Sequence, residues 1–238
     1  MKSIRRKRVY VSAFIVFLSL SAFAQRPMSF RAFKRYTSKV YDIRYKNPKG
    51  FTDLKAVDWF WRLSPGSNGV VSMHSFVFRS NDGNCLLMYP HFIETFFWIQ
   101  PPSIKHKITT EIKGLLGLFD SEGRMLADDI DFDKYVQIAS AEEAHRWFNA
   151  DSVYVSHLPL KEAYEGRYDH CVGVYIGKKD RPSLYFKLFL TEEGMMNEKR
   201  YLQTLCRSVS YRNDDWVYSE EIDEKAGVDV LFKNHFKR

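Results

Sequence analysis

The stretch that decides the fold comprises Tyr168–Ile176 (YDHCVGVYI), Gly177–Pro182 (GKKDRP) and Ser183–Leu190 (SLYFKLFL). The two outer segments are rich in β-branched and aromatic residues, and the middle segment carries the Gly and Pro of a turn. This pattern predicts two antiparallel strands joined by a short loop. Thr191 follows as a candidate N-cap of a helix, and Val209–Tyr211 predicts a further strand.

The same alternation continues toward the N-terminus. Ser103 is expected to cap a helix that ends at Phe119, and Ser140–Glu143 forms a capping box for a helix that ends at Phe148. Four more strands are expected at Val40–Tyr45, Val70–Phe78, Cys85–Tyr89 and Ser152–Leu158. Residues 80–84 predict a hairpin between two of them. Strands joined by hairpins, with a few helices, predict an α+β fold with a largely antiparallel sheet and flanking helices.

Composition supports one globular unit. The chain has 238 residues, of which 45% are hydrophobic and 27% charged, and this excludes intrinsic disorder and a small disulfide scaffold. The expected organisation is an irregular lead-in at 25–36, a single α+β domain at 37–212 with a helical insertion near 101–150, and a charged tail at 213–238.

The first 24 residues predict a signal peptide. A basic segment at residues 2–8 precedes an apolar stretch, and small residues at Ala22 and Ala24 fit a cleavage site before Gln25. We therefore expect cleavage between Ala24 and Gln25 and a mature chain that is periplasmic or secreted. The alternative is a retained anchor, but the apolar segment Val9–Ala24 is shorter than the roughly 20 residues of a spanning helix. No other apolar run of that length occurs, so no transmembrane segment is expected in the mature chain.

The net charge of +7 comes mostly from this leader. Residues 1–24 hold five of the 36 basic residues and no acid, which leaves 31 basic against 29 acidic residues in the rest of the chain. A nearly neutral body does not indicate a nucleic-acid-binding protein, so no nucleic-acid partner is expected.

The cysteines are three in number, Cys85, Cys171 and Cys206, and each lies among apolar residues. They are expected to be small buried residues, although one disulfide between two of them stays open.

No catalytic, cofactor-binding or metal-binding residue can be assigned, and no cofactor is expected. The sequence holds no nucleophile elbow, Walker A loop or paired-histidine zinc motif. The cluster Asp169-His170-Cys171 offers ligand atoms, but neighbours on a strand point to opposite faces. Asp129, Asp131 and Asp133 resemble the start of a calcium loop that then lacks its Gly and Glu, so a solvated acidic loop is favoured.

Aromatic residues are concentrated in two short segments, Trp59-Phe60-Trp61 and Phe96-Phe97-Trp98. If one face of the sheet stays open, Trp59, Trp61 and Trp98 are candidates for stacking on a sugar or a peptide. The alternative, which we favour, is that layers on both sides of the sheet cover these rings.

Two sets of segments resemble known families. Tyr41–Phe51, Leu184–Leu190 and the elements that follow at Thr191 and Val209 resemble PsbP-like proteins, in which a Pro-x-Gly-aromatic turn follows an opening strand. Phe148–Ser152 and Phe189–Gly194 resemble uncharacterised exported proteins of gut Bacteroidetes. The resemblance implies an α/β/α sandwich used mainly as a non-enzymatic binding or assembly module.

Two functions follow as expectations. The first is an exported, non-enzymatic domain that binds a protein or a cell-envelope ligand. The second is a periplasmic hydrolase whose carboxylates or histidines have no recognisable linear motif. A pocket in which titratable groups converge favours catalysis, whereas an apolar or aromatic surface without them favours binding.

Overall fold

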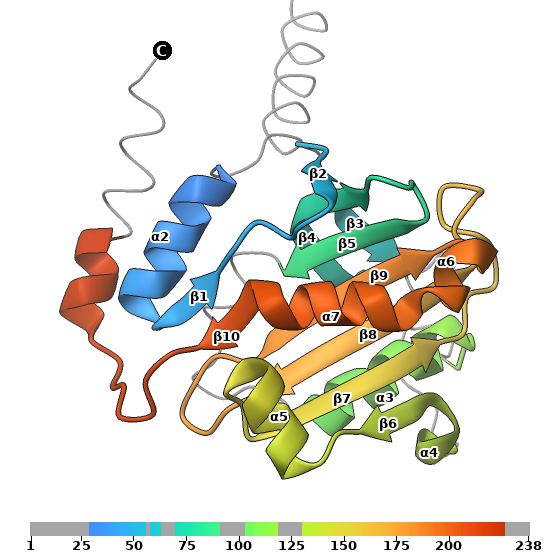
Figure 1. The fold of residues 1–238 in the computed structure, drawn as a ribbon. Coiled ribbons are helices and arrows are strands. Elements are labelled where there is room, and N and C mark those ends of the chain that lie inside the picture. Colours follow the sequence, from blue (N-terminus) through green and yellow to red (C-terminus); the bar gives the residue numbers. More distant parts are fainter. Residues whose placement is uncertain (1–28, 56–57, 63–69, 91–102, 119–129, 227–238) are drawn as a thin grey trace, which may run out of the picture.

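The computed structural model describes residues 29–55, 58–62, 70–90, 103–118 and 130–226 (Figure 1). The candidate cleavage site at Ala24 and Gln25 lies outside these residues, as does Trp98. No helix in the described ranges is long and apolar enough to cross a bilayer.

The centre of the fold is an eight-stranded sheet in which every neighbouring pair is antiparallel. The order across the sheet is β2 (Phe51–Asp53), β4 (Val70–Ser80), β5 (Cys85–Pro90), β9 (Leu184–Leu190), β8 (His170–Gly177), β7 (Ser152–Leu158) and β6 (Val136–Ile138). β3 (Asp58–Arg62) also pairs with β4. β1 (Ile43–Tyr45) and β10 (Val209–Tyr211) form a separate two-stranded sheet. These pairings confirm the α+β fold with a largely antiparallel sheet.

The middle of the sheet joins distant parts of the chain. The hairpin β4–β5 meets the hairpin β8–β9 through β5 and β9, where Cys85 pairs with Leu190. Every residue of β9 is buried, because β9 has a strand on each side and helices on both faces. The two predicted hairpins are therefore confirmed, and their joining places the strand Leu184–Leu190 at the centre of the molecule.

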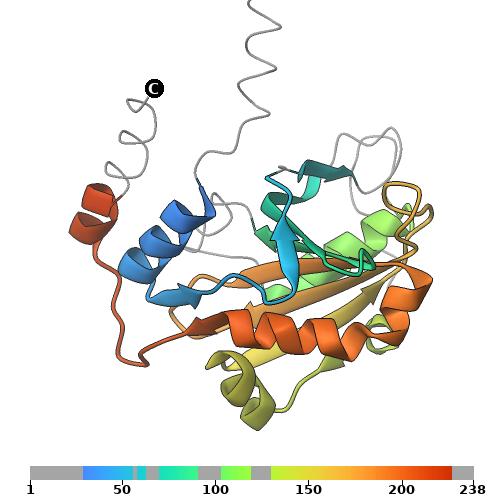
Figure 2. The ribbon, with the colours of Figure 1, turned by 45° about the horizontal axis from the view of Figure 1, so that its top comes forward.

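Helices cover both faces of the sheet, as Figures 1 and 2 show. One face carries α2 (Phe30–Val40), α5 (Ala141–Phe148) and α7 (Glu198–Ser208), with the short α6 (Glu192–Met196) leading into α7. The other face carries α3 (Ile104–Leu115), and α4 (Phe132–Tyr135) lies next to β6. Each face has its own apolar core, so the sheet lies between two hydrophobic layers.

Helix caps follow the sequence closely. Ser140 and Glu143 form the expected capping box of α5, and Asn149 ends the helix in the left-handed conformation at φ 50°. Ser103 caps α3, which ends at Leu115 rather than at the expected Phe119. Thr191 caps α6, and the chain then bends at Asn197 so that one expected helix becomes two.

The expected irregular lead-in at 25–36 is wrong from Phe30 onward. Ser29 accepts a hydrogen bond from the Ala32 amide and starts α2, which continues to Val40. The helix forms because Phe30, Phe33 and Val40 lie on one face, together with Tyr36 and Thr37, and all are buried against the sheet. Consequently the expected strand Val40–Tyr45 begins only at Ile43.

The expected charged tail at 213–238 is packed as far as Ala226. Trp216 Nε1 donates to the Val40 carbonyl at 3.2 Å, and Tyr218 donates to Asp223 at 2.7 Å. Residues 220–226 are helical, and Asp223 also accepts a hydrogen bond from Tyr36 of α2. The segment expected as a helical insertion near 101–150 is likewise part of the fold, because it supplies α3 and the edge strand β6.

Candidate functional site

A groove runs between α5 and α7 above the strands β7 and β8. It encloses about 650 Å³, which is within the range of about 300–1,000 Å³ usual for small-molecule sites. We call it the α5–α7 groove. Its lining residues are Gln137, Glu143, Arg146, Trp147, Phe148, Val153, Val155, Val174, Glu198, Lys199, Leu202, Gln203, Cys206 and Arg207.

The floor of the groove is apolar. Val153 and Val155 of β7 point to the same side because alternate residues of a strand share a face, and Val174 of the neighbouring β8 joins them. Leu202 of α7 and Trp147 of α5 form the walls and are only half-buried, so apolar surface stays open to a ligand.

The rim of the groove carries charge of both signs, but its acids are engaged. Glu143 accepts hydrogen bonds from the Ser140 amide and hydroxyl at 3.1 Å, and Glu198 binds a histidine. In contrast, Lys199 and Arg207 are exposed and make no hydrogen bond or ion pair with any residue that the structure describes. The unsatisfied charge of the rim is therefore positive.

One histidine lies beside the rim. His157 Nε2 of β7 is 3.0 Å and 3.2 Å from the two carboxylate oxygens of Glu198. The hydrogen bond to Glu198 raises the pKa of His157, and partial burial opposes this. The pair is an ion pair when His157 is protonated, and it ties β7 to the first turn of α7.

The groove also contains a thiol, that of Cys206, at the far end of α7. Burial raises the pKa of this thiol to about 11, so it is protonated at neutral pH. Glu198 and Cys206 are separated by about 12 Å along the helix axis at the usual 1.5 Å per residue. The thiol and the His157–Glu198 pair therefore do not form a nucleophile with its base.

A second group of ionisable residues is closed to solvent on the opposite face. Lys187 Nζ of β9 is 2.8 Å from Glu111 Oε2 of α3 and 2.8 Å from the Tyr175 hydroxyl, and Tyr175 also donates to Glu111. The side chains of Lys187 and Glu111 are 0% and 2% exposed. Burial, together with the charge of Glu111, holds the pKa of Tyr175 well above its usual range. No substrate reaches this cluster while α3 covers it.

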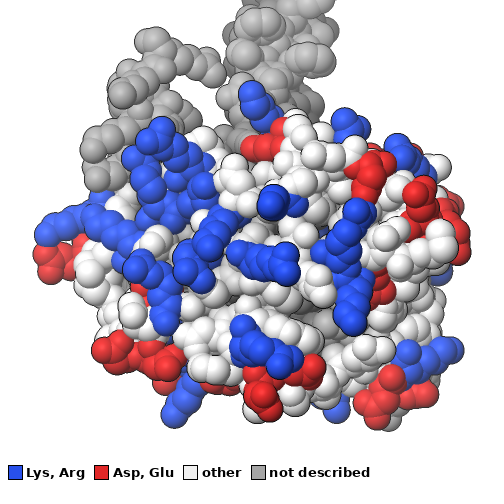
Figure 3. Space-filling model, in the orientation of Figure 1, with Lys and Arg blue, Asp and Glu red and all other residues white. Residues whose placement is uncertain are grey.

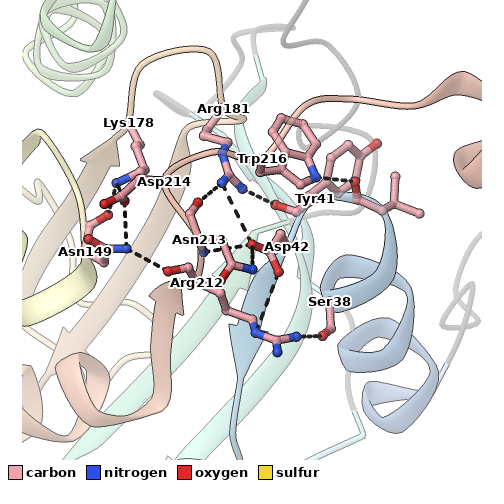
Figure 4. Close-up of polar contacts among 11 residues, drawn as sticks. Ser38, Tyr41, Asp42, Asn149, Lys178, Arg181, Arg212, Asn213, Asp214 and Trp216 are labelled. Carbon is pink, nitrogen blue, oxygen red and sulfur yellow. Dashed lines mark hydrogen bonds and ion pairs between the residues drawn. The ribbon is translucent and has the colours of Figure 1, made fainter.

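A third polar cluster surrounds the buried guanidinium of Arg181 (Figure 4). Arg181 donates to the carbonyls of Tyr41 and Asn213 and stacks on Trp216 at 4.3 Å from the ring centroid. Its ion-pair partner Asp42, 3.9 Å away, accepts two hydrogen bonds from Asn213 at 2.8 Å. These contacts join the loop between β8 and β9 to the residues just before β1 and to the segment after β10, so this cluster fastens the C-terminal segment to the fold.

The residues singled out from the sequence do not gather at the groove. Trp59 and Trp61 lie on β3, at the other end of the sheet, and Trp98 lies outside the described residues. His170 contacts Glu192 at 2.8 Å, while Cys171 is buried beneath the α3 face. Asp131 caps α4, and Asp129 lies outside the described residues. In the described parts of the chain no three His, Cys, Asp or Glu side chains are placed to hold a metal ion.

The cysteines are free in the structure. Cys85 and Cys171 are buried and Cys206 is half-buried. The expectation of small buried residues is confirmed for Cys85 and Cys171 and is wrong for Cys206, and no two of the three are joined in the structure.

The charged rim of the groove was not predicted from the sequence. A signal was present, because Lys199, Gln203 and Arg207 recur at four-residue spacing on the helix expected after Thr191, and form a polar stripe. The floor had no linear signal, since it combines residues of α5, β7, β8 and α7. No family model, curated protein or solved structure matches this chain.

Proposed function

We propose that this protein is an exported, non-enzymatic binding domain whose α5–α7 groove holds a cell-envelope ligand. The observation that carries the proposal is the apolar floor beneath a rim on which Lys199 and Arg207 have no partner in the described structure.

The proposal of export rests on the leader sequence, and mass analysis of the N-terminus of the processed protein tests it. A chain that begins at Gln25 supports export, whereas one that begins at Met1 contradicts cleavage.

The groove favours a ligand with an apolar body and an acidic group. The valine floor and Trp147 offer apolar contact, and a carboxylate or phosphate would pair with the rim cations. A small amphiphile suits the enclosed volume better than a protein surface, which needs a larger buried area. A protein ligand, the other partner expected from the sequence, is therefore an outcome of the test rather than the proposal.

A hydrolase receives less support from the same geometry. The thiol of Cys206 is protonated at neutral pH. His157, which lies beside the groove, is bound to Glu198, and Glu198 is about two helical turns from Cys206 along α7. Binding thus accounts for the arrangement without a reaction.

The test uses dodecanoate, an acid with an apolar chain, in displacement of an anilinonaphthalene sulfonate probe. The variant Lys199→Gln/Arg207→Gln removes the two free rim charges. The matched control is Lys105→Gln/Lys134→Gln, which removes two exposed charges from α3 and α4. We expect dodecanoate to bind the rim variant about 2-fold to 30-fold more weakly, since each exposed charge pair contributes about 0.2–1 kcal/mol.

Two comparisons make the result specific. Neutral dodecanol should bind the native chain and the rim variant equally, because it has no charge to pair. Leu202→Ser should weaken both ligands, because it removes apolar surface from the wall. Equal dodecanoate affinity of the rim and control variants refutes the proposed site. Stable capture of one envelope protein that Leu202→Ser abolishes, without dodecanoate binding, would replace the small ligand by a protein.

A further inference from the structure

We propose that the face formed by α2, β1 and α7 docks on an anionic phospholipid surface. Figure 3 shows Lys and Arg side chains gathered over these elements, with acidic side chains toward the edges of the view. We call this set the basic band. It consists of Arg31, Lys34, Arg35, Lys39, Arg44, Lys46, Lys199, Arg200 and Arg207.

The N-terminal half of the band holds almost no opposing charge within its own stretch of chain, and the acids beside it belong to the helical segment 220–226, which contacts α2 through Asp223 and Tyr36. From Ser29 to Lys49 the chain carries seven basic residues and one acid, Asp42. Asp42 is buried and already occupied by Arg181, Arg212 and Asn213. The positive charge of this segment is therefore not neutralised by its own acid.

The arrangement on α2 is unfavourable for the helix itself. Arg31, Arg35 and Lys39 follow one another at four-residue spacing, and like charges at that spacing destabilise a helix. The first turn of α2 holds no acid, so Arg31 also opposes the helix dipole. These three side chains are exposed and make no hydrogen bond or ion pair with the described part of the chain. An external anionic partner would compensate all of these costs.

The other acid of the band elements is also engaged. α7 contains one acid, Glu198, which is bound to His157. Arg200 pairs with Asp82, whereas Lys199 and Arg207 stay free. Arg44 is the exposed residue of β1, between the buried Ile43 and Tyr45. In Figure 1 the strand β1 lies between α2 and α7.

The composition of the band favours lipid headgroups over a protein or a nucleic acid. Among the described residues the exposed large apolar side chains are Leu116, Ile138, Met196, Val217 and Ile222, and none of these belongs to α2, β1 or α7. A protein interface normally has an apolar centre, which the band lacks. The aromatic residues of α2 point into the core, so they offer no platform on which bases could stack. Charge spread over three elements that carry no exposed large apolar side chain suits a broad anionic surface.

The experiment is vesicle sedimentation of the chain as the cell processes it. Vesicles contain phosphatidylcholine alone or phosphatidylcholine mixed with phosphatidylglycerol. The band variant is Arg35→Gln/Lys39→Gln/Arg44→Gln, and the control Lys105→Gln/Lys134→Gln/Lys161→Gln removes the same charge elsewhere on the surface. None of the three substituted residues lines the α5–α7 groove. The band variant should therefore bind dodecanoate as the native chain does, and a negative result in one assay does not imply a negative result in the other.

We expect binding to the mixed vesicles only, with loss of binding near 1 M salt, where the Debye length is about 3 Å. The band variant should bind about 150-fold more weakly, equivalent to about 3 kcal/mol for three basic residues at the surface. The control should bind as the native chain does. Equal binding of the two variants, or binding to phosphatidylcholine alone, overturns the proposal. Tighter binding to single-stranded DNA or to poly-glutamate than to the mixed vesicles also overturns it.

Discussion

Lys187 offers the sharpest test of how α3 is held on the sheet. It lies in the middle of β9, buried completely, and its ammonium group contacts the Glu111 carboxylate and the Tyr175 hydroxyl at 2.8 Å each. Gly173 is the residue opposite Lys187 on β8, and a side chain there would collide with the Tyr175 ring at about 2.6 Å. The space that this ring needs is therefore provided by the glycine.

Replacing Lys187 by Met keeps most of the volume and removes the charge. Glu111 is then left buried, with Lys107 at 3.9 Å as its remaining cation. Breaking a buried ion pair in this way costs about 3–5 kcal/mol. The loss is a large share of the 5–15 kcal/mol that stabilises a typical domain. For a chain of this size it lowers the melting temperature by roughly 6–20 °C, at 2–4 °C per kcal/mol.

The measurement is urea denaturation of Lys187→Met, Glu111→Leu and the double variant, followed by circular dichroism. The double variant removes both charges, so we expect its free energy of unfolding to be within about 2 kcal/mol of that of the native chain. Part of this difference comes from the hydrogen bond that the Tyr175 hydroxyl loses. The free energies of the single variants should therefore not add. Single variants that each cost less than about 1 kcal/mol and that add would refute a closed ion pair beneath α3.

Three further outcomes are expected elsewhere in the fold. The raised pKa of His157 means that its pairing with Glu198 stabilises the protein below about pH 6.5 and that this gain fades as the pH rises through the folded value; the native chain should thus exceed His157→Gln in urea resistance more at pH 5.5 than at pH 8. A Cβ at Gly194 would meet the Asn84 carbonyl at 2.2 Å, so Gly194→Ala should lower stability by about 1–3 kcal/mol in the same assay. The Cys206 thiol, whose pKa burial raises to about 11, should react with iodoacetamide at pH 8 on the order of 100-fold more slowly than a free cysteine, as timed mass spectrometry would show.

The strands were predictable because their β-branched and aromatic residues, bounded by turn residues, favour extended structure locally and are also the residues that the sheet buries. Ser152–Leu158 was expected with the observed bounds, and the strand expected to end at Leu190 begins one residue late, at Leu184. What the sequence could not show was which strands are central. The charge of Lys187 is typical of a strand with one solvent-exposed face, so it does not indicate that Leu184–Leu190 is central. Its partner Glu111 is 76 residues away and lies on a helix. A contact of that range has no local signal.

The groove was beyond prediction for a related reason. Its cations have a pattern on one helix, whereas its floor exists only once β7 and β8 pair and α5 and α7 cover them. The capping box at Ser140–Glu143 predicted α5 itself but could not place Trp147 on the same groove as Leu202, since these residues are 55 positions apart. Local propensity therefore determined the elements, and tertiary pairing determined the site.

The prediction of an irregular lead-in at 25–36, where the structure has α2, was wrong for a different reason, and this reason bears on function. Its buried residues recur at helical spacing from Phe30 to Val40, so the apolar pattern was present, but the exposed positions are filled with Arg and Lys and no acid. Those cations make the segment resemble an irregular polar lead-in, and they also weaken the helix that Ser29 begins. The charges of α2 do not stabilise the helix itself, because Gln at Arg35 would remove two like-charge pairs at four-residue spacing, those with Arg31 and Lys39. An anionic surface that contacts α2 would therefore relieve the repulsion among its cations. Arg35→Gln should raise the free energy of unfolding and at the same time weaken binding to the mixed vesicles.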